Sequence, residues 1–186
     1  MIPQRIVPAR YGDTRGWFTE SYNKRTLADL GIDCDFVQDN HSFSAARGTL
    51  RGIHFQSPPH AQAKLVRCLA GAIWDIAVDL RAESPTYGRW VAAELTAAGG
   101  EQLFIPVGFG HGFVTLTKNV EVAYKASDYY APESEAGIAW DDTDLAIPWP
   151  LAGIAPFLSG KDAILPRLAE WTSPFVYDGH PLAELN

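Results

Sequence analysis

Short apolar runs, separated by glycine, proline, asparagine and aspartate, dominate the chain. In residues 73–80 four large apolar side chains alternate with Asp75, Ala77 and Asp79. A period of two is typical of a β-strand with one buried face and one face in water. Similar runs predict further strands at 64–69, 89–96, 102–105, 112–116 and 121–127. Many short strands at roughly even spacing predict an all-β sandwich or barrel.

Helical signals are few. Residues 24–30 predict one short helix that ends at Gly31, since glycine is favoured just past a helix end. Residues 161–168 give a weaker signal, because Pro166 limits the length of any helix there. No repeat, low-complexity tract or domain boundary is evident, so residues 1–186 are expected to form a single domain. Short helices and a tail are expected from about residue 155.

Composition and charge narrow the class of protein. Hydrophobic residues make up 47% and charged residues 20%, as in ordinary globular domains. The net charge of −7 argues against a general nucleic-acid binder, which needs a basic face to neutralise phosphates. Two cysteines without a paired motif predict neither a disulfide scaffold nor a zinc site. No apolar run reaches the ~18–20 residues that span a bilayer, and no signal peptide is evident. We therefore expect a cytoplasmic protein without nucleic-acid or membrane partners.

Five histidines supply candidate acid–base groups. His60 and His180 are expected on exposed loops. His41 follows a run of amides and acid, and it either belongs to a capping cluster or lines a polar pocket. His54 lies between Ile53 and Phe55, where a histidine can equally be part of the core.

The surroundings of His54 suggest more than packing. Arg51 is close in sequence, and Gly52 allows another backbone or a ligand to approach. Strict alternation places Arg51 and His54 on opposite faces of a strand. A pocket shared by both side chains therefore requires a β-bulge at Gly52.

The stretch from Gly100 to His111 has the pattern G-x5-P-x-G-x-x-H. This pattern resembles the second motif of the cupin superfamily, a barrel of two antiparallel sheets. Pro106 would end one strand, and the following glycines would form a tight turn. His111 would then begin the next strand and point into the barrel mouth.

The first cupin motif, which supplies metal ligands, is incomplete. Gln56 stands where the second histidine belongs, and no glutamate follows within five residues. A site with three histidines, or two histidines and a carboxylate, cannot be assembled from these positions. The sequence therefore favours metal-free acid–base chemistry over a metal-dependent oxygenase.

Two further side chains have two interpretations each. Lys64 opens an apolar strand, and its ammonium is either solvated at the strand end or directed at an anion. Tyr124 shares a strand face with Val122, and it is either a packed barrel residue or an acid. The spacing alone leaves both questions open.

Taken together, ten segments resemble the dTDP-4-dehydrorhamnose 3,5-epimerases, in order, from about Arg15 to about Leu168. They are residues 15–20, 36–42, 50–56, 64–67, 75–81, 84–88, 105–113, 124–125, 128–130 and 140–142. The resemblance implies a cupin-like jelly-roll barrel of two antiparallel sheets. It also implies inversion of C3 and C5 of dTDP-4-dehydro-6-deoxy-D-glucose, giving dTDP-4-dehydro-L-rhamnose, without a cofactor or metal.

The resemblance also implies roles for individual residues. His54 corresponds to the general base, Asp162 to its paired carboxylate and Tyr124 to the acid. Lys64 corresponds to the cation beside the developing enolate oxygen, and Arg51 to a pyrophosphate-binding arginine. Further ligand-contacting positions correspond to Arg15, Phe18, Glu20, Gln38, Asn40, His111, Glu135 and Lys161.

Members of this family form homodimers in which an N-terminal strand can cross to the partner. Arg15 and Glu20 are therefore expected to serve the neighbouring subunit's site. Two alternatives remain open from the sequence: inversion at C3 or C5 alone, and a non-catalytic module that binds a sugar nucleotide. The presence of both His54 and Tyr124 disfavours the module.

Overall fold

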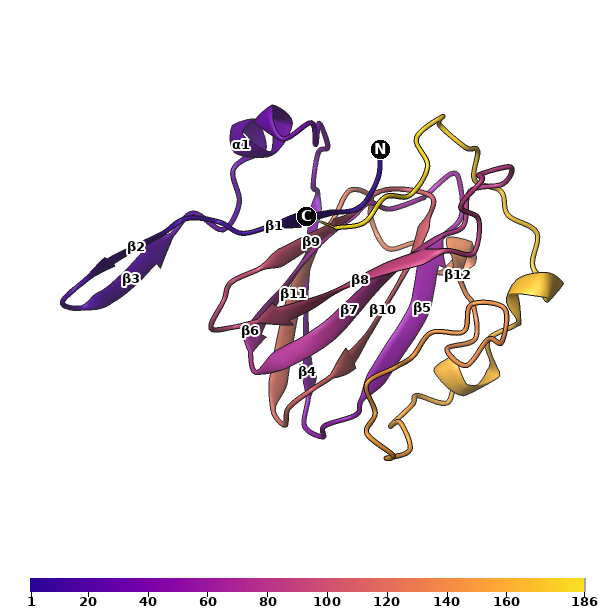
Figure 1. Ribbon diagram of the computed structural model, residues 1–186. Coiled ribbons are helices and arrows are strands. Elements are labelled where there is room, and N and C mark those ends of the chain that lie inside the picture. Colours follow the sequence, from indigo (N-terminus) through magenta and orange to yellow (C-terminus); the bar gives the residue numbers. More distant parts are fainter. Residues whose placement is uncertain (186) are drawn as a thin grey trace.

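The computed structural model describes residues 1–185, and it consists mainly of two antiparallel sheets that face each other (Figure 1). The first sheet has the order β1 (Gln4–Ile6), β9 (Gln102–Ile105), β6 (Lys64–Ala70), β11 (Val120–Ala126) and β4 (Gln38–Ser44). The second has the order β12 (Glu135–Gly137), β5 (Leu50–Gln56), β10 (Phe109–Thr115), β7 (Ala72–Asp79) and β8 (Trp90–Thr96). The predicted barrel of two antiparallel sheets is confirmed, and the six predicted strands coincide with β6 to β11 to within a few residues.

A hairpin of β2 (Arg10–Asp13) and β3 (Gly16–Thr19) extends away from the barrel (Figure 1). Its strands are almost entirely exposed. The alternation of residues did not predict this hairpin, because neither strand has a buried face that would impose a hydrophobic period.

Both faces of β7 are buried, and this corrects the prediction of a strand with one face in water. Ile73 and Ala77 point inward and pack in the cluster between the sheets. Ile76 and Val78 point outward, where residues of the C-terminal segment such as Phe175 cover them. The sequence pattern separated the two faces, but the face with Asp75 and Ala77, which it placed in water, is the one that points into the barrel.

The helices follow their capping signals. In α1 (Lys24–Asp29) the side chain of Asn23 accepts hydrogen bonds from the first turn, and Gly31 has a φ of 80° just past the end. The predicted helix at 161–168 is wrong: two 3₁₀ turns, η2 (Asp162–Ile164) and η3 (Leu168–Glu170), lie on either side of Pro166. Another 3₁₀ turn, η1 (Pro132–Ser134), precedes β12. No helix in residues 1–185 is long and apolar enough to cross a membrane.

The bulge at Gly52 that a pocket shared by Arg51 and His54 requires is present. His54 is paired with His111 and Arg51 with Phe113, so β5 has one more residue than β10 over this stretch. Gly52 has a φ of 121°, and a Cβ there would lie 2.5 Å from Gly112 Cα. Paired residues point to the same face of a sheet, and His111 and Phe113 both point inward. The bulge therefore directs Arg51 and His54 into the barrel together.

The turn before β10 follows the pattern from Gly100 to His111, which resembles the second cupin motif, with one difference. Gly108 has a φ of 93°, which fits the tight turn after Pro106. The strand already begins at Phe109, so Gly110 lies within it rather than in the turn. A Cβ on Gly110 would lie 2.6 Å from Ile53 Cγ2, so this glycine is needed for close packing of β10 on β5.

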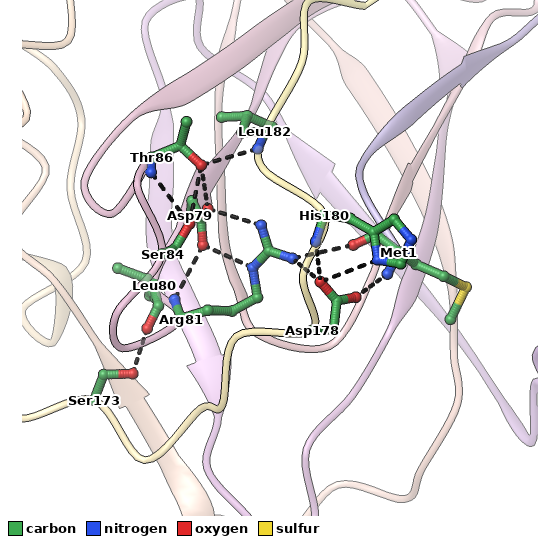
Figure 2. A network of polar contacts seen from close by, with 10 residues as sticks. All are labelled: Met1, Asp79, Leu80, Arg81, Ser84, Thr86, Ser173, Asp178, His180 and Leu182. Carbon is green, nitrogen blue, oxygen red and sulfur yellow. Dashed lines mark hydrogen bonds and ion pairs between the residues drawn. The ribbon is translucent and has the colours of Figure 1, made fainter.

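A buried ion pair anchors the end of β7 (Figure 2). The guanidinium of Arg81 donates to both carboxylate oxygens of Asp79 at 2.9 and 2.8 Å, and the two side chains are 2% and 0% exposed. The hydroxyls of Ser84 and Thr86 donate to Asp79 at 2.7 and 2.8 Å. Arg81 also donates to Asp178 in the C-terminal tail at 2.7 Å. The network thus joins β7, the turn after it and the tail.

Replacing Asp79 with alanine is expected to lower the free energy of unfolding by about 3–5 kcal/mol, because Arg81 would stay buried without its main counter-charge. Chemical denaturation measures this loss. Asp178→Ala is the matched control: it removes the half-exposed partner of the same arginine, and it should cost clearly less. Equal losses for the two variants would contradict this view of the network.

Candidate active site

Polar side chains from both sheets converge inside the barrel. The second sheet contributes His54 from β5, His111 from β10 and Asp75 from β7. The first sheet contributes Lys64 from β6 and Tyr124 from β11. Further inward residues of these strands, such as Val66, Ile73 and Val122, are apolar and form the core between the sheets. The interior therefore combines an apolar core with a polar site that holds acids, bases and a cation.

His54 and Asp162 form a direct pair. His54 Nε2 is hydrogen-bonded to Asp162 Oδ1, and the backbone N–H of Asp162 donates to the hydroxyl of Ser159 at 3.0 Å. Burial raises the pKa of Asp162, but its hydrogen bonds with His54 and Ser159 outweigh burial and hold the pKa below the usual value. Asp162 is thus a carboxylate that orients the imidazole. The His54 side chain is 29% exposed, so the ring remains open to a ligand.

Lys64 lies inside the barrel and is not solvated at the strand end. Burial lowers the pKa of its ammonium from 10.5 to about 8, against the opposing effect of the Asp75 and Glu135 carboxylates. Its Nζ lies 5.9 Å from the centre of the Tyr124 ring. A buried cation is suited to a ligand's oxygen.

Tyr124 and His111 are neighbours in this interior, with ring centres 6.5 Å apart. Burial raises the pKa of Tyr124, so the phenol stays protonated near neutral pH and can act as a proton donor. His111 is buried, and its Nε2 lies 2.7 Å from Asp75 Oδ1. Burial lowers the pKa of His111, although Asp75 opposes that shift.

Asp75 was not among the site residues predicted from sequence. A carboxylate in a largely apolar strand was the available signal, and we interpreted it as a residue on a wet face. Asp79 was also placed on the face in water, and it is 0% exposed.

A second group of predicted residues forms a chain of contacts from β4 to η2. Gln38 Nε2 donates to Asn40 Oδ1 at 2.9 Å. Gln38 Oε1 accepts from the backbone N–H of Tyr130 at 3.0 Å, and the Tyr130 hydroxyl donates to Glu135 at 2.7 Å. Glu135 is also paired with Lys161. Tyr130 was missed as an individual residue, although it ends the segment 128–130.

Arg51 lies between these groups. Its guanidinium donates to the Phe43 carbonyl at 3.1 Å and to the Ser44 hydroxyl at 3.3 Å. Burial raises the pKa of both Asp162 and Tyr124, and the charge of Arg51 opposes this effect at each. Arg51 therefore belongs to the same interior as His54, as the bulge at Gly52 requires.

Three predicted residues lie apart from this interior. Arg15 is at the tip of the β2–β3 hairpin, 88% exposed and paired with Asp13. Phe18 on β3 is 69% exposed. Glu20 lines a cavity of about 450 Å³ on the outer side of the first sheet with residues such as Arg67, and Asn40 and Tyr124 also border this cavity. Within one chain the hairpin therefore adds nothing to the site around His54.

The remaining histidines lie outside the interior. His41 points outward from β4 and pairs with Glu121 at 3.0 Å, so it does not line the inner pocket. His60 and His180 lie on loops, as predicted, near Asp128 and Asp178. In the described part of the chain no three His, Cys, Asp or Glu side chains are grouped so that they could hold a metal ion. A reaction without metal or cofactor stays a prediction.

Comparison with known proteins gives a consistent result. Residues 4–170 match the family model described as dTDP-4-dehydrorhamnose 3,5-epimerase. The enzyme of that name from Salmonella typhimurium is 52% identical over 170 residues, which is 90% of this chain and 92% of the relative.

Two crystal structures are similar as well. The Bacillus anthracis dTDP-4-dehydrorhamnose 3,5-epimerase with TDP and pyrophosphate bound is 50% identical, with a TM-score of 0.85 over 88% of this chain and 92% of that one. The Legionella pneumophila dTDP-6-deoxy-D-glucose-3,5-epimerase in complex with dTDP-4-keto-L-rhamnose is 48% identical, with a TM-score of 0.85 over 89% and 87%.

Proposed function

The chain belongs to the dTDP-4-dehydrorhamnose 3,5-epimerase family and is an isomerase. We propose that His54, Lys64 and Tyr124 carry out the reaction inside the barrel. The observation that carries this proposal is the placement of His54 and Tyr124 on opposite sheets of one interior. Inversion of a carbon needs a base on one face and an acid on the other. The substrate class is a dTDP-linked 4-keto-6-deoxy sugar, consistent with the ligands in the similar crystal structures.

The chemistry of the sugar matches these side chains. The hydrogens on C3 and C5 are both α to the C4 carbonyl, so removal of either leaves an enolate stabilised by the same oxygen. His54 takes the proton from carbon, and the electron pair moves onto the carbonyl oxygen. The ammonium of Lys64 stabilises the negative charge that develops there. The hydroxyl of Tyr124 then returns a proton to the same carbon from the opposite face.

The surrounding residues support binding and orientation. Asp162 holds the imidazole of His54 and stabilises the imidazolium that forms when His54 takes a proton. The guanidinium of Arg51 has the planar fork that suits the paired oxygens of a pyrophosphate. The remaining ligand contacts within the same chain are assigned to Gln38, Asn40, His111, Glu135 and Lys161.

The β2–β3 hairpin is assigned to the neighbouring subunit's site in a homodimer. It extends away from its own barrel, and it exposes Arg15 and Phe18 without contact with the interior (Figure 1). An exposed arginine and phenylalanine on a projecting hairpin are suited to a nucleotide, because a guanidinium binds phosphate and an aromatic ring stacks on a base. Glu20 follows directly after this hairpin.

Mixed dimers test this arrangement. His54→Asn and Arg15→Ala should each reduce activity when expressed alone. When the two variants are co-expressed, half of the dimers combine both chains, and one site in each of these is intact. About a quarter of wild-type activity should therefore return.

No recovery in the mixed dimers, with dimers demonstrated by ultracentrifugation, would place Arg15 in its own chain's site. A monomer would exclude the crossed arrangement altogether. Expression of each variant with a second copy of itself is the control. It forms no intact site, so activity should stay at the level of the single variant.

The alternatives from the sequence can now be weighed. The relative at 52% identity is a 3,5-epimerase, which favours double over single inversion. Membership in an enzyme family disfavours the non-catalytic binding module. The cytoplasmic location and the single-domain organisation stay predictions.

A further inference from the structure

Asp75 is buried inside the barrel with only one of its two carboxylate oxygens satisfied. Oδ1 lies 2.7 Å from His111 Nε2, whereas Oδ2 has no hydrogen-bond partner among residues 1–185. The residue is 0% exposed. A buried polar atom without a partner costs free energy, so a half-satisfied carboxylate in the middle of a strand requires an explanation.

A buried cation lies in the same interior. Lys64 and Asp75 project inward from opposite sheets, and the charge of Asp75 is the largest influence that favours the protonated form of Lys64. Without such a counter-charge, an ammonium group that is out of water loses its proton readily. Within residues 1–185 no ion pair within 4.0 Å joins Lys64 to Asp75, so the carboxylate acts on the ammonium through its charge across the interior and not through a direct contact.

We propose that Asp75 is a positioning residue for the reaction, which orients the His111 ring and keeps the Lys64 ammonium charged at neutral pH. This inference rests on the proposed function, in which Lys64 stabilises the enolate oxygen. By accepting a hydrogen bond from His111 Nε2, Asp75 leaves the Nδ1 atom of the neutral ring free to accept one from a ligand. Burial raises the pKa of Asp75, and the contact with His111 and the charge of Lys64 oppose that shift.

Other charged groups around Lys64 cannot take over this role. Glu135 also acts on Lys64, but its carboxylate is already paired with Lys161 and the Tyr130 hydroxyl. The other ionisable groups of this interior are Tyr124 on β11, His111 on β10, Arg51 and His54 on β5, and Asp162 on η2. Asp162 is committed to His54. Of these three carboxylates, Asp75 is the one with a buried oxygen that has no hydrogen-bond partner within residues 1–185.

The test is Asp75→Asn. Asparagine has nearly the same shape, and its amide oxygen still accepts from His111, so the variant removes the charge and keeps the hydrogen bond. In the ligand-free protein the pKa of Lys64 should fall from about 8 by roughly one further unit. NMR titration of protein labelled with ¹³C-lysine measures it, with Lys64→Met to assign the signal. The alkaline limb of kcat/KM should move to lower pH by the same amount.

Glu94→Gln is the matched control. Glu94 lies on β8, the strand next to β7, but it points outward and is exposed, so its loss should not shift the Lys64 titration. Asp75→Ser removes the same charge in a smaller side chain, and it replaces Asp75→Asn if that variant does not fold. An unchanged Lys64 pKa in the folded variant overturns the proposal.

The outcomes also separate this proposal from the proposed function. If Lys64→Met retains wild-type turnover, the role of Lys64 in catalysis fails, but the titration still reports the effect of Asp75 on Lys64. If Lys64→Met is inactive and Asp75→Asn leaves the titration unchanged, the proposed function stands and the role of Asp75 fails.

Discussion

His54→Asn is expected to reduce deuterium exchange at both C3 and C5 of the substrate by about 10²–10⁴-fold, which is the usual contribution of a positioned general base. Asparagine still accepts and donates hydrogen bonds, so the pocket keeps its polarity but loses the group that accepts the proton. Both carbons should be affected together, because a single base faces the whole sugar ring. Proton NMR of the reaction in D2O measures both exchanges in the same sample.

The control for this variant is His180→Asn. His180 lies on the C-terminal tail, and its side chain is 71% exposed. Its replacement removes a histidine without touching the interior, so exchange should continue at the wild-type rate. If His54→Asn exchanged both carbons as fast as the wild-type protein, a different base would have to be sought.

Tyr124→Phe is expected to separate exchange from inversion. Without the phenol, the acid on one face is lost, and the rate of epimerisation should fall by about 10²–10⁴-fold. His54 can still remove a proton and return deuterium to the same face of the carbon. We therefore expect deuterium incorporation to persist with retained configuration, at a rate closer to that of the wild-type protein.

The ratio of inversion to exchange is the quantity to measure. Tyr87→Phe serves as the control, because Tyr87 lies on the outer surface and its side chain does not enter the barrel. If Tyr124→Phe inverted its substrate at the wild-type rate, or lost exchange and inversion in parallel, Tyr124 would not be the acid on the opposite face.

Much of the fold follows from local patterns. The period of two predicted the strands, and Gly31 predicted a helix end from local stereochemistry. The bulge at Gly52 was a condition for a pocket shared by Arg51 and His54. The burial of Asp75 and Asp79 could not be predicted in this way. Alternation shows that a strand has two faces, but it does not show which face lies inward: the face that carries Asp75 points into the barrel, and this depends on how the two sheets pack together.

The same difference between local patterns and contacts of distant segments applies to the site. Arg51 and His54 are three positions apart, so the bulge that unites them can be inferred from the chain itself. His54 and Asp162 are 108 positions apart, and only the resemblance to a family suggested that they pair. The contact between Asp75 and His111 was not anticipated, because it depends on the register of β7 against β10.

The most direct test of the central claim, that one interior inverts two carbons, is proton NMR of dTDP-4-keto-6-deoxy-D-glucose incubated with the protein in D2O. We predict deuterium at both C3 and C5, and a product with both centres inverted. Deuterium at only one of the two carbons would contradict the double epimerisation. Deuterium at neither would contradict the assignment of this interior as the site of the reaction.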